Sequence, residues 1–289
     1  YTHVLNASIP GGSQVINTND TANNRFKAGD EILIIQLQGQ YNGSYEFKRI
    51  QSISSNVITL DAPLKNSYTS GTFNSTASQA TQIVRVPNFM NVTIQNNGYI
   101  TAPQWSGWVG GIVAFKALGN VTIETGGAIN ATGMGFRGGF GQGDGLPAVN
   151  GTQGESFRGK GADSNASNDG GGGAGISSDF TPAMQRGGTA AYGTSPTTPG
   201  GSTQSSHNGS IYGVTDLALL LPGSGGGAGF RTPTNLSGGS GGGIVFIAAK
   251  SINVSGNIKA RGTTGNAENN PTGNTWASGT GSGGAILIL

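Results

Sequence analysis

The feature that most constrains the fold is a stretch of sequence that occurs twice. Residues 110–133 read GGIVAFKALGNVTIETGGAINATG, and residues 242–262 read GGIVFIAAKSINVSGNIKARG. In each copy a Gly-Gly pair precedes three short runs in which apolar and polar residues alternate. An alternation with a period of two is typical of β-strands that bury one face. A unit of three short strands cannot bury that face alone, so we expect the copies to stack on each other.

A parallel β-helix, with one coil for each copy, is the simplest fold in which such units stack. Aligning the copies gives two sets of inward-pointing residues that face each other. These sets are Ile112, Val121, Ile123, Ile129 and Ala131 in the first copy, and Ile244, Ile252, Val254, Ile258 and Ala260 in the second. The related stretch NVTIQNNGYITAP at 91–103 predicts one more coil.

The last residues of the chain, GGAILIL at 283–289, repeat the start of a coil. An apolar strand edge invites pairing with another strand. We therefore expect this edge to be covered either by further polypeptide or by a strand of a neighbouring subunit.

The first 85 residues follow a different pattern. The stretches DEILIIQLQG (30–39), YEFKRIQSI (45–53) and NVITL (56–60) predict antiparallel strands, with a hairpin turn at Ser54-Ser55-Asn56 between the last two. We expect residues 1–85 to form a small β module that resembles a sandwich or barrel. We expect residues 86–289 to form the β-helix-like domain, interrupted by an excursion at 133–243. The single helix candidate is 215–221, which Pro222 and Gly223 would end.

Glycine makes up 54 of the 289 residues, and much of it lies in the excursion, for example in GSGGGAG at 223–229 and GGSGGG at 238–243. One interpretation is a flexible surface insertion. The other is that the glycine runs are ordered as polyglycine-II helices, which pack closely because they have no Cβ atoms. Apolar anchors within the excursion favour the ordered interpretation; they are Phe136, Phe140, Phe157, Phe180, Tyr192, Tyr212 and Phe230.

Taken together, the repeated strands, the glycine blocks and the closing GSGGAILIL resemble the glycine-rich parallel β-helix modules of prokaryotic cell-surface proteins and adhesins. The resemblance covers residues 90–289. A weaker similarity links the chain to phage tail-fibre adhesins, whose receptor-binding domains use packed polyglycine helices. These resemblances imply an all-β fold, an extracellular or cell-surface location, and a structural or adhesive role. They bring no catalytic motif.

Many asparagines lie in N-x-Ser/Thr sequons, the acceptor sites of N-linked glycans. They are Asn6, Asn19, Asn42, Asn74, Asn91, Asn120, Asn130, Asn150, Asn165, Asn208, Asn235 and Asn253. In Asn120-Val121-Thr122-Ile123, inward-pointing Val and Ile force Asn and Thr outward, because side chains alternate along a strand. A Ser-, Thr- and Asn-rich surface also produces sequons by accident, so the pattern leaves both explanations open.

Composition and charge exclude several classes of function. The net charge is only +2 and the cations are scattered, so we expect no nucleic-acid partner. No apolar run approaches the ~20 residues of a membrane span, and there is no cysteine. We expect no cofactor and no metal site, since the calcium-like stretch GGFGQGDGL at 138–146 occurs once and has Asp144 out of place.

An enzyme that acts on polysaccharides would need carboxylates gathered on one face of the coils. Glu124 is the one acid in the repeated strands, and His3 and His207 have no partner pattern. We therefore expect no catalytic residues, and keep a β-helix enzyme that uses Asp163 or Asp169 only as a third alternative.

The sequence favours a secreted, N-glycosylated structural surface protein. We expect it to assemble head-to-tail with itself, by β-strand addition between subunits, into an extracellular filament or layer. The alternative is an adhesin, cellular or phage, that binds a surface polysaccharide or receptor. It would use the glycine-rich loops and the aromatic faces of Trp105, Trp108 and Trp276.

Overall fold

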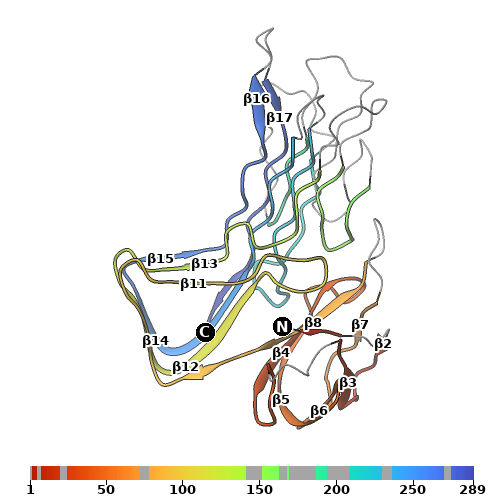
Figure 1. Ribbon diagram of the computed structural model, residues 1–289. Coiled ribbons are helices and arrows are strands. Elements are labelled where there is room, and N and C mark those ends of the chain that lie inside the picture. Colours follow the sequence, from red (N-terminus) through yellow and green to blue (C-terminus); the bar gives the residue numbers. More distant parts are fainter. Residues whose placement is uncertain are drawn as a thin grey trace.

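The computed structural model describes residues 2–4, 8–19, 25–71, 78–140, 152–162, 168, 187–193, 208–229, 236–269 and 275–289. Within these ranges every regular element is a β-strand, and no helix is present. Figure 1 shows three parts: an N-terminal module, a set of stacked parallel strands, and a group of glycine-rich segments that extends away from both. The prediction of an all-β chain is therefore confirmed for the described residues.

The N-terminal module contains a six-stranded antiparallel sheet with the order β1-β8-β4-β5-β6-β3. Its strands are β1 (Thr2–His3), β3 (Val15–Asn17), β4 (Glu31–Gln38), β5 (Tyr45–Ser54), β6 (Val57–Leu60) and β8 (Ala80–Arg85). A separate pair consists of β2 (Ser8–Ile9) and β7 (Tyr68–Thr69). The predicted hairpin turn lies between β5 and β6, where Ser55 has a positive φ of 51°.

The central strand β4 explains how this module joins the rest of the molecule. Its side chains alternate between two hydrophobic clusters, so Ile32 and Ile34 pack inside the module. Leu33 and Ile35 face the other way and share a cluster with residues of the stacked strands. The apolar run in β4 is therefore buried on both faces. The division of the chain near residue 85 stays a prediction, and one core draws on both sides of it.

The stacked strands form two parallel sheets, which we call the parallel stack (Figure 1). The larger has the order β10-β12-β14-β18, with β9 also paired to β12. Its strands are β9 (Asn88–Phe89), β10 (Val92–Ile94), β12 (Ile112–Ile123), β14 (Ile244–Val254) and β18 (Ile286–Ile288). The smaller sheet contains β11 (Tyr99–Thr101), β13 (Ala128–Asn130) and β15 (Asn257–Lys259).

The register of the parallel stack follows the alignment of the two sequence copies. Ile112 pairs with Ile244, Val121 with Ile252, and Ile123 with Val254. Ile129 pairs with Ile258 in the smaller sheet. The stretch at 91–103 supplies β10 and β11, which lie one layer further out.

The last strand also follows its predicted register, since Val245 pairs with Ile286. Three inward positions were wrong. Ile112 and Ile244 are buried in the cluster shared with the module, and the next residues, Val113 and Val245, point into the core of the stack instead. Val254 is 44% exposed and lies outside that core. The reason for this exposure is that β18 covers only the first part of β14, which leaves the end of β14 without a further layer.

The glycine-rich segments form a third kind of structure, which we call the glycine bundle. Its described segments are 133–140, 152–155, 187–191, 221–229, 236–243, 260–266 and 277–285. The segments are joined by backbone hydrogen bonds that recur every three residues. For example, Gly223 and Gly226 donate to the carbonyl oxygens of Gly242 and Gly239. A short antiparallel pair, β16 (Ala267–Asn269) and β17 (Thr275–Ala277), lies at the far end of the bundle (Figure 1).

Segment 221–229 lies at the centre of the glycine bundle. Its backbone exchanges hydrogen bonds with segments 133–140, 152–155, 187–191, 236–243 and 277–285. The central glycines do not have positive φ values, so glycine is not needed there for its backbone freedom. It is needed for close approach: a Cβ on Gly225 would lie less than 3 Å from the carbonyl oxygen of Arg137. The described part of the excursion is therefore packed and hydrogen-bonded.

The helix expected at 215–221 is absent. Asp216 accepts a hydrogen bond from the backbone N–H of Ala218 at 3.0 Å, and Leu217 has a positive φ of 55°. These features make a turn, because a short polar side chain competes with the helix for backbone donors. The leucines after the turn instead pack on the module, where Leu220 N–H donates to the carbonyl oxygen of Gly43.

Candidate functional site

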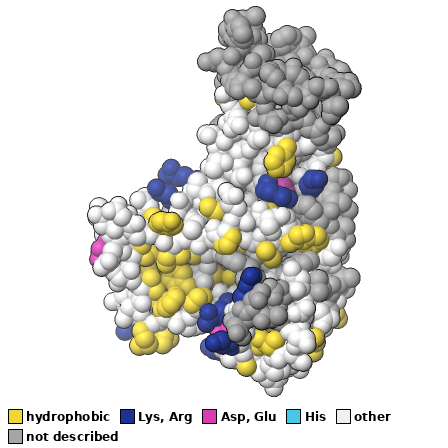
Figure 2. Space-filling view, in the orientation of Figure 1, with side chains coloured by type: hydrophobic (Ala, Val, Ile, Leu, Met, Phe, Trp, Pro, Cys, Tyr) yellow, Lys and Arg dark blue, Asp and Glu magenta, His cyan; other side chains and the backbone are white. Residues whose placement is uncertain are grey.

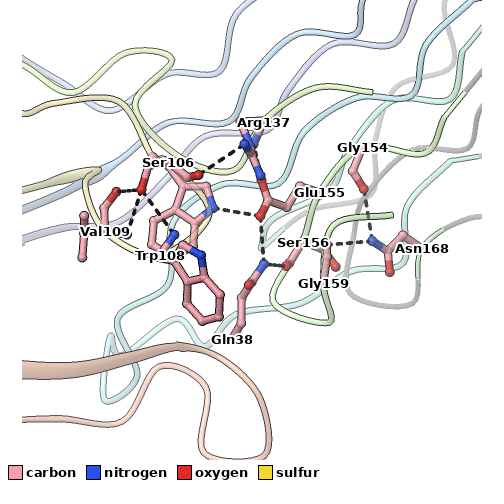
Figure 3. Close-up of polar contacts among 11 residues, drawn as sticks. Gln38, Ser106, Trp108, Val109, Arg137, Gly154, Glu155, Ser156, Gly159 and Asn168 are labelled. Atoms are coloured by element: carbon pink, nitrogen blue, oxygen red, sulfur yellow. Dashed lines mark hydrogen bonds and ion pairs between the residues drawn. The ribbon is translucent and has the colours of Figure 1, made fainter. Parts of the chain in front are cut away.

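A buried carboxylate lies where the three parts of the molecule meet. Glu155 is 2% exposed and accepts hydrogen bonds on both oxygens (Figure 3). Oε1 accepts from Trp105 Nε1 at 2.9 Å and from Gln38 Nε2 at 3.2 Å. Oε2 accepts from the Arg137 backbone N–H at 3.2 Å and from Arg137 Nε at 2.9 Å. We call Glu155, Gln38, Trp105 and Arg137 the Glu155 cluster.

The Glu155 cluster connects the three parts and leaves little room for chemistry. Gln38 ends β4 of the module, Trp105 follows β11 of the stack, and Arg137 and Glu155 belong to the glycine bundle. A carboxylate has about four acceptor positions, and four donors occupy those of Glu155. A buried charge that is paired and hydrogen-bonded in this way holds structural elements in place.

The structure corrects the hypothesis of a tryptophan platform for sugars. Trp105 is 3% exposed and packs edge-to-face against Phe136, with ring centroids 5.6 Å apart. Trp108 is half-buried against the same core. These two rings are therefore used for packing, because their large apolar surfaces cover the junction between the stack and the bundle. The side chain of Trp276 lies outside the described residues.

A cleft of about 370 Å³ opens beside the Glu155 cluster, between the module and the glycine bundle. We call it the junction cleft. Its described lining consists of Gly39, Gln40, Asn42, Ser78, Gln79, Phe157 and Arg158. The side-chain amides of Gln40, Asn42 and Gln79 have no hydrogen-bond partner within the described part of the chain. The cleft therefore offers polar groups that are free to bind a ligand.

The walls of the junction cleft are held by hydrogen bonds between the module and the turn at 156–159. Gly39 N–H donates to the Phe157 carbonyl at 3.2 Å, and Ser78 N–H donates to the Arg158 carbonyl at 3.1 Å. Gln38 Nε2 donates to the Ser156 carbonyl at 2.7 Å. These bonds fix the backbone of the turn and leave the Arg158 side chain exposed.

Sequence patterns pointed to two residues of this cleft, Asn42 as a sequon and Phe157 as an apolar anchor. The other lining residues come from three separate stretches of the chain, and no local pattern brings them together. The one local signal is GESFRGK at 154–160, which is unusually rich in charge for this chain.

The predicted sequons are spread over the molecule. Those at Asn6, Asn74, Asn150, Asn165 and Asn235 lie outside the described residues. The exposed ones are Asn19, Asn91, Asn120 and Asn253, and the partly buried ones are Asn42, Asn130 and Asn208. Exposure is compatible with a glycan, but the attachment itself stays a prediction.

Two of the exposed sequon asparagines also have a structural role at one corner of the stack. Asn91 Oδ1 accepts a hydrogen bond from the Asn120 backbone N–H at 2.8 Å. Asn120 Oδ1 in turn accepts from Ser251 Oγ at 2.8 Å. The carbonyl oxygens of these side chains tie successive layers together where β12 has an irregular register, between Ala117 and Asn120.

Acidic residues considered for metal binding or catalysis, Asp144, Asp163, Asp169 and Asp179, lie outside the described residues, as does His207; the side chain of His3 is likewise not described. Among the described residues, no group of three His, Cys, Asp or Glu side chains is placed to hold a metal ion. Within the same ranges, no helix is long and apolar enough to cross a bilayer.

No family model matches the chain, and no curated protein matches its sequence. Among solved structures, the chain is similar to the gp54 tailspike of Acinetobacter baumannii bacteriophage AP22, in complex with A. baumannii capsular saccharide. The identity is 13% and the TM-score 0.24, over 46% of this chain and 24% of the tailspike. It is also similar to the tailspike protein gp49 from Pseudomonas phage LKA1, with 16% identity and a TM-score of 0.21, over 45% of this chain and 27% of that one. The chain thus spans about a quarter of either tailspike, and both TM-scores are too low to establish a shared fold.

Proposed function

We propose that this protein is a non-enzymatic adhesin, displayed outside the cell or on a virion, that binds a surface saccharide or receptor. Its body would consist of a short parallel β-helix and a polyglycine-II bundle. The observation that carries the proposal is the way these parts are joined. The Glu155 cluster and a shared hydrophobic core link module, stack and bundle, which favours one stiff body for the display of a binding surface.

The glycine bundle supports this proposal through its mechanics. Each backbone N–H of 223, 225, 226, 227 and 228 donates to a carbonyl oxygen of a neighbouring segment. Ordering glycine costs more backbone entropy than ordering any other residue, so the bundle persists only because its contacts are dense. A protease needs a locally opened chain, and such packing suppresses opening. These properties suit a protein that works outside the cell.

A glycan array and immobilised bacterial polysaccharides, probed with the whole chain, test the adhesin proposal. We expect retention on at least one class of saccharide and no shortening of that saccharide with time. Absence of retention on every saccharide and on whole cells would reject the adhesin. Release of new reducing ends would instead favour the polysaccharide enzyme.

A filament subunit is the second candidate, and one surface feature favours it. Figure 2 shows hydrophobic side chains gathered on the face that the first layer of the stack encloses. An apolar groove of about 250 Å³ lies there, lined among others by Phe89, Ile100, Val113 and Phe115. On this side β10 and β11 are the end strands of their sheets, and β18 is the end strand on the other side. A β18 strand of a second copy would continue the larger sheet and generate a head-to-tail polymer.

Electron microscopy of the purified protein at several concentrations distinguishes the candidates. Regular filaments that are lost when Thr93 is replaced by Pro would support strand addition, because proline removes a backbone donor from the edge strand β10. Single particles at all concentrations would exclude the filament subunit and leave the adhesin as the remaining candidate.

N-linked glycosylation is a further part of the proposal. We expect glycans on Asn253 and Asn19, whose side chains are exposed. Intact-mass and peptide mass spectrometry of protein from its native source would measure occupancy. Unmodified asparagine at every sequon would mean that the sequons arise from composition alone.

A further inference from the structure

We propose that the junction cleft is a binding site for an acidic saccharide. Arg158 would pair with the carboxylate of a uronic acid, and the amides of Gln40, Asn42 and Gln79 would bind hydroxyl groups of the sugar. This inference rests on the proposed adhesin function and assigns it a site. The volume of about 370 Å³ lies within the range of roughly 300–1,000 Å³ that is usual for small-ligand sites.

The amides of the cleft match the hydrogen-bonding pattern of a sugar. A carboxamide presents an acceptor oxygen and two donor hydrogens, and a sugar hydroxyl needs both an acceptor and a donor. The amides of Gln40, Asn42 and Gln79 have no partner among the described residues, so a ligand displaces only water from them. They come from the turn after β4 and from the approach to β8, and so surround the ligand from two sides.

An apolar wall completes the sugar-binding character of the cleft. The Phe157 ring lines the cleft and is half-buried, packed against Tyr212 with ring centroids 5.4 Å apart. An aromatic ring held in this way offers a fixed surface for the C–H groups of a sugar. Because the contact with Tyr212 already holds the ring in place, binding a ligand orders it little further. The entropic cost of binding is therefore low.

The charge of the cleft selects an acid over a neutral sugar. Arg158 is exposed, and its guanidinium carbon lies 5.9 Å from the centre of the Phe157 ring. No acidic side chain lines the described walls, and the nearby Glu155 is already paired with Arg137. A guanidinium forms two parallel hydrogen bonds with a carboxylate. A single cation suits the single charge of a uronic acid better than the double charge of a phosphate.

The backbone that presents these groups is fixed before a ligand arrives. The turn at 39–43 contains Gly43 with a φ of 81°, and a Cβ there would lie 2.8 Å from Leu219 Cβ. Hydrogen bonds from Gly39 and Ser78 hold the opposite wall, formed by Phe157 and Arg158. A site whose groups are already in position loses little binding energy to rearrangement.

The experiment uses the whole chain, with tri-galacturonate as the acidic probe and its methyl ester as the neutral one. Isothermal titration calorimetry should show that the wild type binds the acid at least about tenfold more tightly than the ester, the size expected for a charged hydrogen bond. Arg158→Gln should remove this difference. Arg261→Gln is the matched control and should bind like the wild type, since Arg261 is exposed like Arg158 but does not line the junction cleft.

Asn42 needs a separate variant because it is also a sequon. Ser44→Ala removes the sequon and keeps the amide, whereas Asn42→Asp keeps the shape and adds a negative charge. We expect Ser44→Ala to bind the acid as the wild type does, and Asn42→Asp to bind it at least about tenfold less tightly, by repulsion. Equal melting temperatures of all variants would show that the fold is intact.

Three results would overturn the inference. They are equal affinity for the acid and its ester, equal behaviour of Arg158→Gln and Arg261→Gln, and no heat of binding for either probe at millimolar concentration. The adhesin proposal fails separately. If Arg158→Gln keeps wild-type retention on the glycan array, the adhesin stands and its site lies elsewhere. If the array is blank and tri-galacturonate still binds the cleft, the site stands and adhesion does not.

Discussion

The parallel stack and the glycine bundle hold their segments together by opposite means. In the stack, hydrogen-bonded strands carry large side chains inward, and Val121, Ile123 and Ile129 are fully buried. In the bundle, segment 221–229 has no side chain larger than serine between Gly223 and Gly229, and its neighbours contact the backbone directly. The stability of the stack therefore depends on large apolar side chains that fill its core. The stability of the bundle depends on having no side chains between its central segments. The two should respond differently to the same kind of substitution.

The largest effect is expected for Gly225→Ala in the centre of the bundle. The new Cβ would lie less than 3 Å from the backbone carbonyl of Arg137, and no side-chain rotation relieves a clash with backbone. We expect a loss of about 4 kcal/mol or more in the free energy of unfolding, at the upper end for single substitutions. Chemical denaturation measures it.

Gly283→Ala is the control within the same bundle. A Cβ at Gly283 meets only the carbonyl oxygen of Ala260, at 3.6 Å, and Gly283 does not have a positive φ. We expect this variant to keep wild-type stability or gain slightly. If Gly225→Ala is equally stable, close approach of backbones is not what requires glycine in the bundle.

The next effect is expected in the stack, where the cost should depend on the volume removed. Ile123→Ala should cost about 2–5 kcal/mol and Ile123→Val about 0.5–1.5 kcal/mol, because the cavity grows with the atoms deleted. In the bundle, by contrast, Gly225→Ser should cost as much as Gly225→Ala, since the first added carbon already clashes. Two equal costs at Ile123 would break this distinction.

Sequence alone was informative about the stack and nearly silent about the bundle, for a physical reason. The side chains of the stack alternate and repeat, so the pairing of Ile112 with Ile244 and of Val245 with Ile286 follows from aligning the copies. A glycine run has no side-chain pattern, so nothing in GSGGGAG says which segments surround it. The neighbours of segment 221–229 come from across the excursion and from the end of the chain.

The candidate sites show the same limit. Glu155 and Arg137 stand eighteen positions apart, and Gln38 lies in another module, so their meeting depends on the packing of the whole molecule. The junction cleft likewise joins residues from three stretches. The mistaken helix at 215–221 shows the converse: its local signals favoured a helix, and Asp216 used its side chain to make a turn instead.

The variant Glu155→Gln tests whether the parallel stack and the glycine bundle unfold as one unit. The amide keeps the shape of the carboxylate but places an NH₂ group against donors of Arg137 or of Trp105 and Gln38. We expect a loss of about 3 kcal/mol, as for other buried ion pairs broken on one side. Fluorescence of the tryptophans and hydrogen exchange of the bundle should then report separate transitions. Coincident transitions would show that the shared hydrophobic core is enough to couple the parallel stack and the glycine bundle without the Glu155 cluster.

Alkaline pH should weaken the packing of Tyr212 against the glycine bundle. Burial raises the pKa of Tyr212, whose hydroxyl donates to the Pro222 carbonyl at 2.8 Å and accepts from Ser224 Oγ at 2.9 Å. The folded state therefore holds this proton more tightly than the unfolded state. The stability that depends on it is complete below the usual tyrosine pKa of about 10 and falls as the pH rises above that value. Thermal melts at pH 8 and pH 11 measure the loss, which Tyr212→Phe should reduce.

Acid should weaken the join between module and stack, with the smallest effect of the series. Burial alone would raise the pKa of Glu31, but hydrogen bonds from Lys116 and Asn88 outweigh it and hold that pKa below its usual 4.5. Lys116 Nζ lies 2.6 Å from Glu31 Oε1 and links β12 to β4. The stability from this ionised carboxylate is present above about pH 4.5 and is lost as the pH falls through the lowered pKa.

Hydrogen-exchange protection factors, followed by segment from pH 6 to pH 3, measure where acid acts. Segments 221–229 and 236–243 contain no titratable side chain, so their protection should fall less than that of β4 and β12. Glu31→Gln serves as the control, because it removes the titrating group and should flatten the response at β4. A fall in the two glycine segments that matches the fall in β4 would mean that the bundle has no stability of its own and owes its order to the module and stack beneath it.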